Sequence, residues 1–300
     1  MAAAERDGAR RAGQAGEGGA HPLDALLRPA RGQLFRWCEH QGRELLLVEH
    51  PRCSAVFSRQ GGQLLHYQPR GERPVLWCAR HWPRVGAIRG GVPVCWPWFG
   101  RHPVESGWPH HGWARLSDWR LVGKDADAQG VRLEWRLQLH DWQVELRACL
   151  GDALSLELVT THQDSEPCVL SQALHADWRV SDVARVALLG LDGADGHDLL
   201  AREPCRQTGE LRVTEGVHRR FQRGGALTLQ DPGWQRRLRI DGGDNPHTVV
   251  WHPGSRPLPE VSWSESLGFL SVLAASCGEP GRVLAPGDEA RLALKAWIAG

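Results

Sequence analysis

The 300-residue sequence lacks an excess of charge of either sign. Its 36 lysines and arginines balance 35 aspartates and glutamates, which gives a net charge of +1 with neutral histidines. Proteins that bind nucleic acids or acidic membranes through their surface usually carry a basic excess. The balance therefore gives no support for a nucleic acid or a membrane as the main partner. The sequence also has no apolar run of roughly 20 residues, the length that a membrane-spanning helix needs.

Paired cysteines are missing as well. The eight cysteines are scattered, with no CxxC pair and no spacing to histidine that is typical of a metal site. A chain of this length builds a core without disulfides, and its first residues contain no apolar segment typical of a secretion signal. We therefore expect free thiols, a cytoplasmic protein and no metal site built from these cysteines.

The first 30 residues mix glycine, alanine and charged residues, a composition typical of a disordered tail, with a short helical pattern near Leu23–Leu27. From residue 31 onwards no change in composition and no internal repeat divides the chain. The sequence thus predicts a disordered tail over residues 1–30 and a single domain over residues 31–300. We expect this domain to be monomeric.

Long amphipathic helices are not indicated either. Short apolar runs alternate with turn pairs such as Gly61-Gly62 and Gly224-Gly225. In the run at 131–142 apolar residues recur at every second position, and residues 291–297 behave in the same way. Period-two alternation is typical of half-buried strands. The sequence therefore predicts an all-β fold, a large antiparallel β-sandwich.

Tyrosine and phenylalanine are scarce, whereas tryptophan is abundant. The chain has one tyrosine, five phenylalanines and 15 tryptophans. Either tryptophan simply fills core positions that other aromatic residues could fill, or a few tryptophans form the wall of a sugar site. The second interpretation rests on the flat apolar face of indole, which stacks on the C–H faces of pyranose rings.

The segment from Ile88 to Trp119 is the most informative stretch. It reads IRGGVPVCWPWFG, a variable loop and then HHGWARLSDW. Two arginines, Arg89 and Arg115, stand in backbone punctuated by glycine and proline, and a guanidinium group is a fork of donors suited to phosphate or carboxylate. The segment therefore indicates a site for a small anionic molecule.

Four segments in the same order carry a family resemblance: IRGGVPVCWPWFG, HHGWAR, SQALHADWRVSDVARVALLGLDG and VVWHPG. They resemble the hexose-6-phosphate mutarotases (glucose-6-phosphate 1-epimerases) of the aldose 1-epimerase superfamily, from about Phe35 to the C-terminus. The resemblance implies a galactose-mutarotase-like β-sandwich and a hexose 6-phosphate as partner. It also implies acid–base opening of the sugar ring without a cofactor: a histidine protonates the ring oxygen, and a glutamate is the base.

Two arginines and two glycines match the family's phosphate-holding segments. By resemblance, Arg89 and Arg115 bind the phosphate of the sugar, and their charge-assisted hydrogen bonds are stronger than neutral ones. Gly90 and Gly91 are expected to let the backbone approach the ligand closely.

Two histidines also match. His111 corresponds to the histidine of the family's HGFAR segment and is expected to contact a substrate hydroxyl. His175 in ALHADW corresponds to the general acid. His110 stands where glutamine is common in the family, and it is either a ligand contact or a loop residue without a role. Asp177 departs from the family's tyrosine and is close enough in sequence to perturb the pKa of His175.

The catalytic base of the family has no counterpart in the matching register. In FLSVLAAS, Leu273 stands where the family's FVCVEAA has its glutamate. Glu265 and Glu279 flank this strand but lie outside the register. In TEGVHRRF, His218 stands where the family has a supporting aspartate, and it is the candidate substitute base if it faces the pocket.

Three functions follow for comparison with the structure. The leading prediction is a hexose-6-phosphate mutarotase that interconverts the α and β anomers of glucose 6-phosphate by acid–base ring opening. The first alternative is a catalytically impaired relative that binds sugar phosphate as a sensor or regulatory protein, which Leu273 favours. The second is a mutarotase for unphosphorylated sugars, which the paired arginines disfavour.

Overall fold

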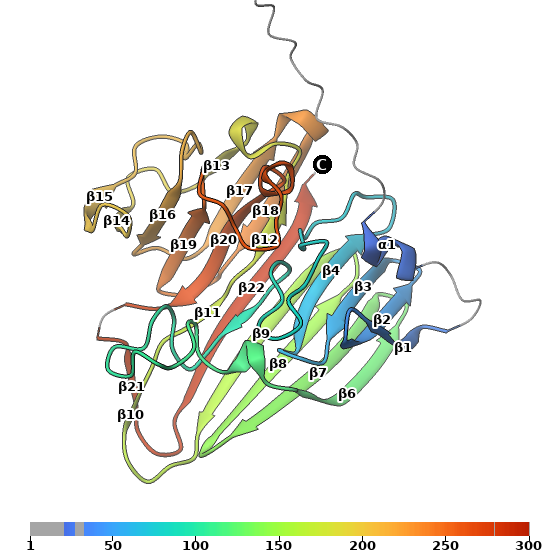
Figure 1. Ribbon diagram of the computed structural model, residues 1–300, viewed down its shortest axis with the longest axis horizontal. Coiled ribbons are helices and arrows are strands. Elements are labelled where there is room, and N and C mark those ends of the chain that lie inside the picture. The colour runs from blue at the N-terminus through green and yellow to red at the C-terminus, as the bar shows by residue number, and fades with distance from the viewer. Residues whose placement is uncertain (1–20, 28–32, 279, 300) are drawn as a thin grey trace, which may run out of the picture.

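The computed structural model describes residues 21–27, 33–278 and 280–299 as a set of antiparallel sheets (Figure 1). An N-terminal sheet contains four strands in sequence order: β1 (Phe35–His40), β2 (Arg43–His50), β3 (Cys53–Ser58) and β4 (Gln63–Pro69). The first eight-stranded sheet, here the long sheet, has the order β13-β17-β18-β22-β9-β8-β7-β6. Its strands are β6 (Arg120–Asp127), β7 (Gly130–Leu139), β8 (Trp142–Leu150), β9 (Ala153–His162), β13 (Ala187–Leu189), β17 (Ala226–Asp231), β18 (Arg236–Asp241) and β22 (Glu289–Ala299).

The second eight-stranded sheet, here the site sheet, has the order β15-β14-β16-β19-β20-β11-β5, with β12 also paired to β20. Its strands are β5 (Val94–Cys95), β11 (Gln172–Leu174), β12 (Asp177–Arg179), β14 (Asp195–Asp198), β15 (Glu203–Arg206), β16 (Val217–Phe221), β19 (His247–His252) and β20 (Phe269–Ser276). A two-stranded ribbon and short helices complete the described chain: β10 (Cys168–Leu170), β21 (Arg282–Leu284), α1 (Pro22–Leu26), α2 (Trp263–Ser266) and the 3₁₀ turns η1 (Ala114–Leu116), η2 (Val183–Arg185) and η3 (Pro232–Trp234).

The N-terminal sheet and the site sheet both pack on the long sheet, which makes the molecule a β-sandwich. Phe57 of β3 stacks on Trp135 of β7 with ring centroids 5.8 Å apart, while β20 and β11 contact β22. An isolated bridge from Leu64 of the N-terminal sheet to Val92, just before β5, links the N-terminal sheet to the segment that leads into the site sheet. In Figure 1 the N-terminal sheet (blue) and the site sheet (mostly orange) occupy different ends of the molecule. The all-β antiparallel sandwich predicted from the sequence is confirmed.

The alternation of residues 131–142 corresponds to strands with one buried and one exposed face, as predicted. Leu133, Trp135 and Leu137 of β7 are buried in the main core, whereas Arg132 and Glu134 are exposed. All eight cysteines are free thiols, as expected. None of the helices in the described ranges has the length and apolar character of a membrane span.

The short helical pattern near Leu23–Leu27 corresponds to a helix. Residues 22–26 form α1, with His21 as its N-cap, whereas residues 1–20 and 28–32 lie outside the described residues. Leu23 is buried in a cluster that also contains Trp77 and Phe269. The apolar side chain of Leu23 therefore packs on the domain.

The site sheet buries one face against the long sheet and turns the other away from it. Along β20, Leu270, Val272 and Ala274 belong to the main core, whereas Leu273 and Ala275 belong to a separate small apolar cluster. Successive side chains of a strand point to opposite faces. The outer face of β20 therefore carries Leu273, and the candidate site lies on this face.

Candidate functional site

A cavity of about 330 Å³ opens on the outer face of the site sheet. Strands β16, β19 and β20, the segment that joins β11 to β12 and the loops around residues 87–93 and 99–115 line this cavity. Of the site residues predicted from the sequence, it contains Arg89, Gly90, His111, Arg115, His175 and His218, together with His110. Residues spread over 130 positions of the chain thus meet in one place.

The two arginines face the cavity without carboxylate partners. Among the described residues neither guanidinium group forms an ion pair, and the side chain of Arg89 has no hydrogen bond. Arg115 donates from Nη2 to the carbonyl oxygen of His110 at 2.6 Å, while its buried Nε–H has no acceptor. Burial lowers the pKa of Arg115, and the nearby charge of Arg89 lowers it further. Two adjacent cations with an unused buried donor are suited to an anion.

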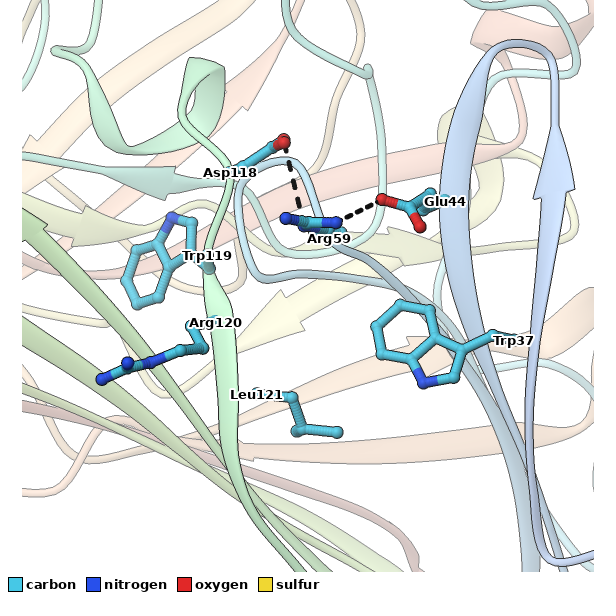
Figure 2. A pocket seen from close by; sticks show the side chains of 7 residues that line it. All are labelled: Trp37, Glu44, Arg59, Asp118, Trp119, Arg120 and Leu121. Atoms are coloured by element: carbon cyan, nitrogen blue, oxygen red, sulfur yellow. Dashed lines mark hydrogen bonds and ion pairs between the residues drawn. The ribbon is translucent and has the colours of Figure 1, made fainter.

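A second cavity, of about 420 Å³, shows how the same residue type behaves when it is neutralised (Figure 2). There Arg59 lies between two carboxylates, with Nη1 2.5 Å from Glu44 and Nε 3.8 Å from Asp118. Figure 2 shows the guanidinium group between these two acidic side chains. Arg59 is therefore neutralised in this cavity, unlike the exposed Arg120 that also lines it, and Arg59 is a natural control for Arg89 and Arg115.

His111 is held by the loop that carries it. Its backbone lies in the left-handed region at φ 63°, its N–H donates to the carbonyl oxygen of Gly100 at 2.7 Å, and its Nδ1 accepts from the Gly100 N–H at 2.9 Å. Burial lowers the pKa of His111 well below its usual value. The imidazole is therefore neutral at pH 7, with Nε2 available as a donor to a ligand hydroxyl.

His175 lies between β11 and β12, where the chain leaves one strand and enters the next. Its backbone N–H donates to Pro93 at 3.0 Å, and its Nε2 is buried without a hydrogen-bond partner. Burial lowers the pKa of His175 to about 3, and the positive charges of Arg115 and Arg89 contribute to the shift. Because buried polar atoms in proteins normally have hydrogen-bond partners, this unpaired nitrogen is a candidate contact for a ligand.

From the sequence, Asp177 was expected only to perturb the pKa of His175, but the structure places it in the cavity itself. It lines the cavity with its side chain 5% exposed, and its Oδ1 lies 3.7 Å from Nε2 of His175. Ser271 donates a 2.5 Å hydrogen bond to the same oxygen. Burial raises the pKa of Asp177 to about 7, against the opposing effects of Ser271 and Arg89. The only sequence signal was its departure from tyrosine two residues after His175.

Leu273 and His218 also lie where their motifs place them. Leu273 is 2% exposed and packs with Val249 and Ala275, so this part of β20 presents an apolar surface to the cavity. His218 on β16 faces the cavity, as its candidate role requires, and burial lowers its pKa, against the effect of Asp198.

Gly90 and Gly91 are required by the fold itself. Both have positive φ, 103° and 66°. A Cβ at Gly90 would lie 2.4 Å from the Cα of Cys78, and one at Gly91 would lie 2.1 Å from the carbonyl oxygen of Leu64. Neighbouring backbone of the protein therefore approaches both glycines closely and fixes the position of Arg89, while the expected approach to a ligand stays a prediction.

Cys95, His111 and His175 bring their donor atoms within 4.8 Å of one another, the one group in the described ranges with metal-like proximity. The chemistry does not favour a cation there. Burial raises the pKa of the Cys95 thiol to about 12, whereas a metal needs the thiolate. The charges of Arg89 and Arg115 in the same cavity would also repel a cation.

A larger compartment of about 900 Å³ adjoins the site cavity, and the two share Phe99, Gly100 and His218. Trp98 stacks on Trp108 in its wall at 5.2 Å between ring centroids. Of the tryptophans, Trp251 lines the site cavity itself. Four other tryptophans are fully buried in the core: Trp96, Trp119, Trp135 and Trp178. Most of the fully buried aromatic volume is thus tryptophan, and a role of Trp251 in a sugar site stays a prediction.

Comparison with known proteins adds independent findings. A protein from Haemophilus influenzae (strain ATCC 51907) described as "Putative glucose-6-phosphate 1-epimerase" is 34% identical over 218 residues, which cover 71% of this chain and 74% of the relative. A protein of the same description from Escherichia coli (strain K12) is 38% identical over 159 residues. That match covers 49% of this chain, and the chain thus spans about half the length (52%) of this relative.

A solved structure and a family model agree with these matches. The crystal structure of a "putative mutarotase (YeaD)" from Salmonella typhimurium superposes with a TM-score of 0.84 at 26% identity, covering 92% of this chain and 98% of that one. The family model described as Aldose 1-epimerase matches residues 44–297, nearly the whole described domain. Sequence, fold and the convergence of the site residues agree, and the chain belongs to the aldose 1-epimerase family.

Proposed function

We propose that the protein is a mutarotase that interconverts the α and β anomers of a hexose 6-phosphate such as glucose 6-phosphate. The observation that carries the proposal is the pair of guanidinium groups, Arg89 and Arg115, which face the same cavity as His175 and form no close ion pair among the described residues. A phosphate dianion supplies the missing negative charge, and charge-assisted hydrogen bonds to arginine fix its position.

The sugar ring would then lie beside the histidines. His175 is the general acid for the ring oxygen, and His111 donates to a hydroxyl. In the empty cavity the arginine charges disfavour the imidazolium form of His175. A bound phosphate offsets those charges and raises the pKa of His175, so substrate binding itself makes the acid competent. This coupling favours a phosphorylated sugar over a neutral one.

Leu273 favours a second candidate function, binding of sugar phosphate without efficient turnover. It replaces the expected glutamate with a side chain that accepts no proton, and loss of a general base typically costs about two to four orders of magnitude in rate. His218 remains the substitute base suggested by the sequence, because it lines the cavity.

The two functions separate in one experiment. Freshly dissolved α-glucose 6-phosphate is followed by polarimetry with no protein, with wild type and with His175→Ala. A mutarotase gives an acceleration proportional to its concentration, which His175→Ala abolishes. No acceleration together with calorimetrically measured binding of glucose 6-phosphate refutes the enzyme and supports the binding protein. Absence of both contradicts the two proposals.

A further inference from the structure

The site cavity contains a carboxylate that the family pattern does not assign. The family's base stands on β20, where this chain has Leu273, and the apolar contacts of Leu273 with Val249 and Ala275 leave no proton acceptor at that point. On the adjacent strand, however, Asp177 is aligned with Ser271 of β20. Ser271 lies two residues before Leu273 and therefore on the same outer face, about 7 Å away along the strand.

We propose that Asp177 is the catalytic base of this enzyme and that β12 provides the carboxylate which β20 has lost. The inference rests on the proposed mutarotase function. Its support is geometric: Asp177 lines the same cavity as Arg89 and His175, its side chain is nearly inaccessible, and its Oδ1 lies 3.7 Å from Nε2 of His175.

This separation suits the two oxygens of the reaction. The anomeric oxygen O1 and the ring oxygen O5 are bonded to the same carbon, C1, so two groups a few ångström apart can contact one oxygen each. Asp177 contacts O1 and His175 contacts O5. Both groups therefore reach the reacting atoms without any movement of the strands, which is the geometric requirement for general acid–base catalysis.

The proton transfers balance within the pair. Asp177 accepts the proton of O1–H, the electrons of that bond form the carbonyl group, and C1–O5 breaks. The electron pair of C1–O5 takes the proton from Nε2 of the His175 imidazolium. After rotation about C1–C2 the ring closes on the other face: the O5–H proton returns to His175 and the carbonyl oxygen takes the proton of Asp177. No net proton is consumed.

The surroundings of Asp177 are those of a proton acceptor that works near neutral pH. Burial disfavours its ionised form, while the hydrogen bond from Ser271 and the charge of Arg89 favour it. The other titratable groups that act on it electrostatically are His175 and the thiols of Cys78 and Cys95. The balance places the pKa of Asp177 at about 7, in the range where a base is both available and strong.

The test compares wild type with Asp177→Asn, which keeps the shape of the side chain, and with His218→Gln as the rival base. The rate of α-glucose 6-phosphate anomerisation is measured over pH 5–9. For Asp177→Asn we expect kcat to fall roughly 10²- to 10⁴-fold with KM changed less than about threefold. For His218→Gln we expect a less than about tenfold change. Leu273→Glu in the Asp177→Asn background should recover part of the rate, because it returns a carboxylate to the outer face.

The pH profile provides a readout that a merely structural residue would not move. The reactive pair holds one proton, on His175, and the free protein below about pH 7 also holds one, on Asp177. In wild type, kcat/KM should therefore fall as the pH rises above about 7, where this proton is lost, and this limb should vanish in Asp177→Asn. Ser271→Ala removes the donor that favours the carboxylate, so the limb should move to higher pH while the rate below it remains.

Three results overturn the proposal, and they are distinguishable. Full activity of Asp177→Asn, or loss of rate only in His218→Gln, overturns the role of Asp177 and leaves the mutarotase function intact. A wild type that does not exceed the spontaneous rate overturns both. If Asp177→Asn does not fold, the shift of this limb in Ser271→Ala decides: an unmoved limb contradicts the assignment.

Discussion

Asp177 and Ser271 lie opposite each other on β12 and β20, and the Ser271 hydroxyl donates a 2.5 Å hydrogen bond to the Asp177 carboxylate. Their side chains come from positions 94 residues apart in the chain. One hydroxyl donor does not replace the hydration that a carboxylate loses on burial. The ionised carboxylate of Asp177 is therefore energetically unfavourable in the wall of the site cavity, and such destabilised ionisable groups are common in functional sites.

This cost predicts that Asp177→Asn stabilises the fold at high pH. Because the pKa of Asp177 is raised from 3.8 to about 7, the folded state holds a proton that the unfolded state has released. The contribution of Asp177 to stability therefore falls as the pH rises from about 4 to about 7, by roughly 1.4 kcal/mol per unit and up to roughly 4 kcal/mol in total. Urea unfolding at pH 4 and pH 8 measures the difference between the two proteins.

The control for this prediction is Asp118→Asn, which removes an exposed carboxylate. We expect the gain in the free energy of unfolding of Asp177→Asn over wild type to be small at pH 4 and to reach a few kcal/mol at pH 8. Asp118→Asn should show no such increase. An Asp177→Asn protein that is equally or less stable than wild type at pH 8 would contradict the buried-charge interpretation.

Free glucose should be a poor substrate that phosphate in solution improves. Without a phosphate, two charge-assisted interactions are lost, and burial together with the uncompensated arginine charges keeps His175 neutral, so kcat/KM should fall roughly 10²- to 10⁴-fold. Inorganic phosphate should then raise the enzymatic rate with glucose. The rate without protein at the same phosphate concentration is subtracted, and sodium chloride matches the ionic strength. Inhibition by phosphate, or no effect, would refute the coupling.

Removal of one cavity arginine should weaken substrate binding selectively. Arg115→Gln should raise the KM for glucose 6-phosphate by about 10- to 100-fold, because it deletes a charged donor to the phosphate. Arg59→Gln is the matched control, since Arg59 is already paired with Glu44 and Asp118 (Figure 2). Steady-state kinetics of both variants measures the effect, and equal changes in KM would argue against an anion site at Arg115.

Gly91→Ala should damage the fold itself. The new Cβ would lie 2.1 Å from the carbonyl oxygen of Leu64, on backbone with φ 66°. We expect a loss of more than about 2 kcal/mol in the free energy of unfolding. Gly71→Ala has a similar φ of 80° but open space around the new atom, so it should lose only about 1 kcal/mol. Thermal or urea unfolding compares the two, and equal losses would show that crowding is unimportant.

Much of the fold could be predicted from local pattern. The alternation along residues 131–139 identifies β7 because one face of this strand is buried and the other is exposed. The short strands β11 and β12 were not identified individually, because a strand of three residues is too short to show an alternation. Their partners lie about 100 positions away on β20, and such long-range register cannot be read from a single sequence.

The site residues show the same limit: residues in sequence motifs could be predicted, whereas contacts that depend on strand pairing could not. Arg89, Arg115 and His175 stand in recognisable segments, and the fold brings them together as expected. Asp177 could be predicted only as a neighbour of His175, because its burial and its alignment with Ser271 depend on the pairing of β12 with β20. The crowding of Gly90 and Gly91 could not be predicted, because the backbone that approaches them comes from other segments of the chain.

The most direct measurement is the exchange between the α and β anomeric protons of glucose 6-phosphate at equilibrium, followed by NMR at increasing concentrations of wild-type protein. The account predicts an exchange rate that rises linearly with protein concentration above the spontaneous rate and returns to the spontaneous rate with His175→Ala. An exchange rate that stays at the spontaneous value while the protein binds glucose 6-phosphate would contradict it.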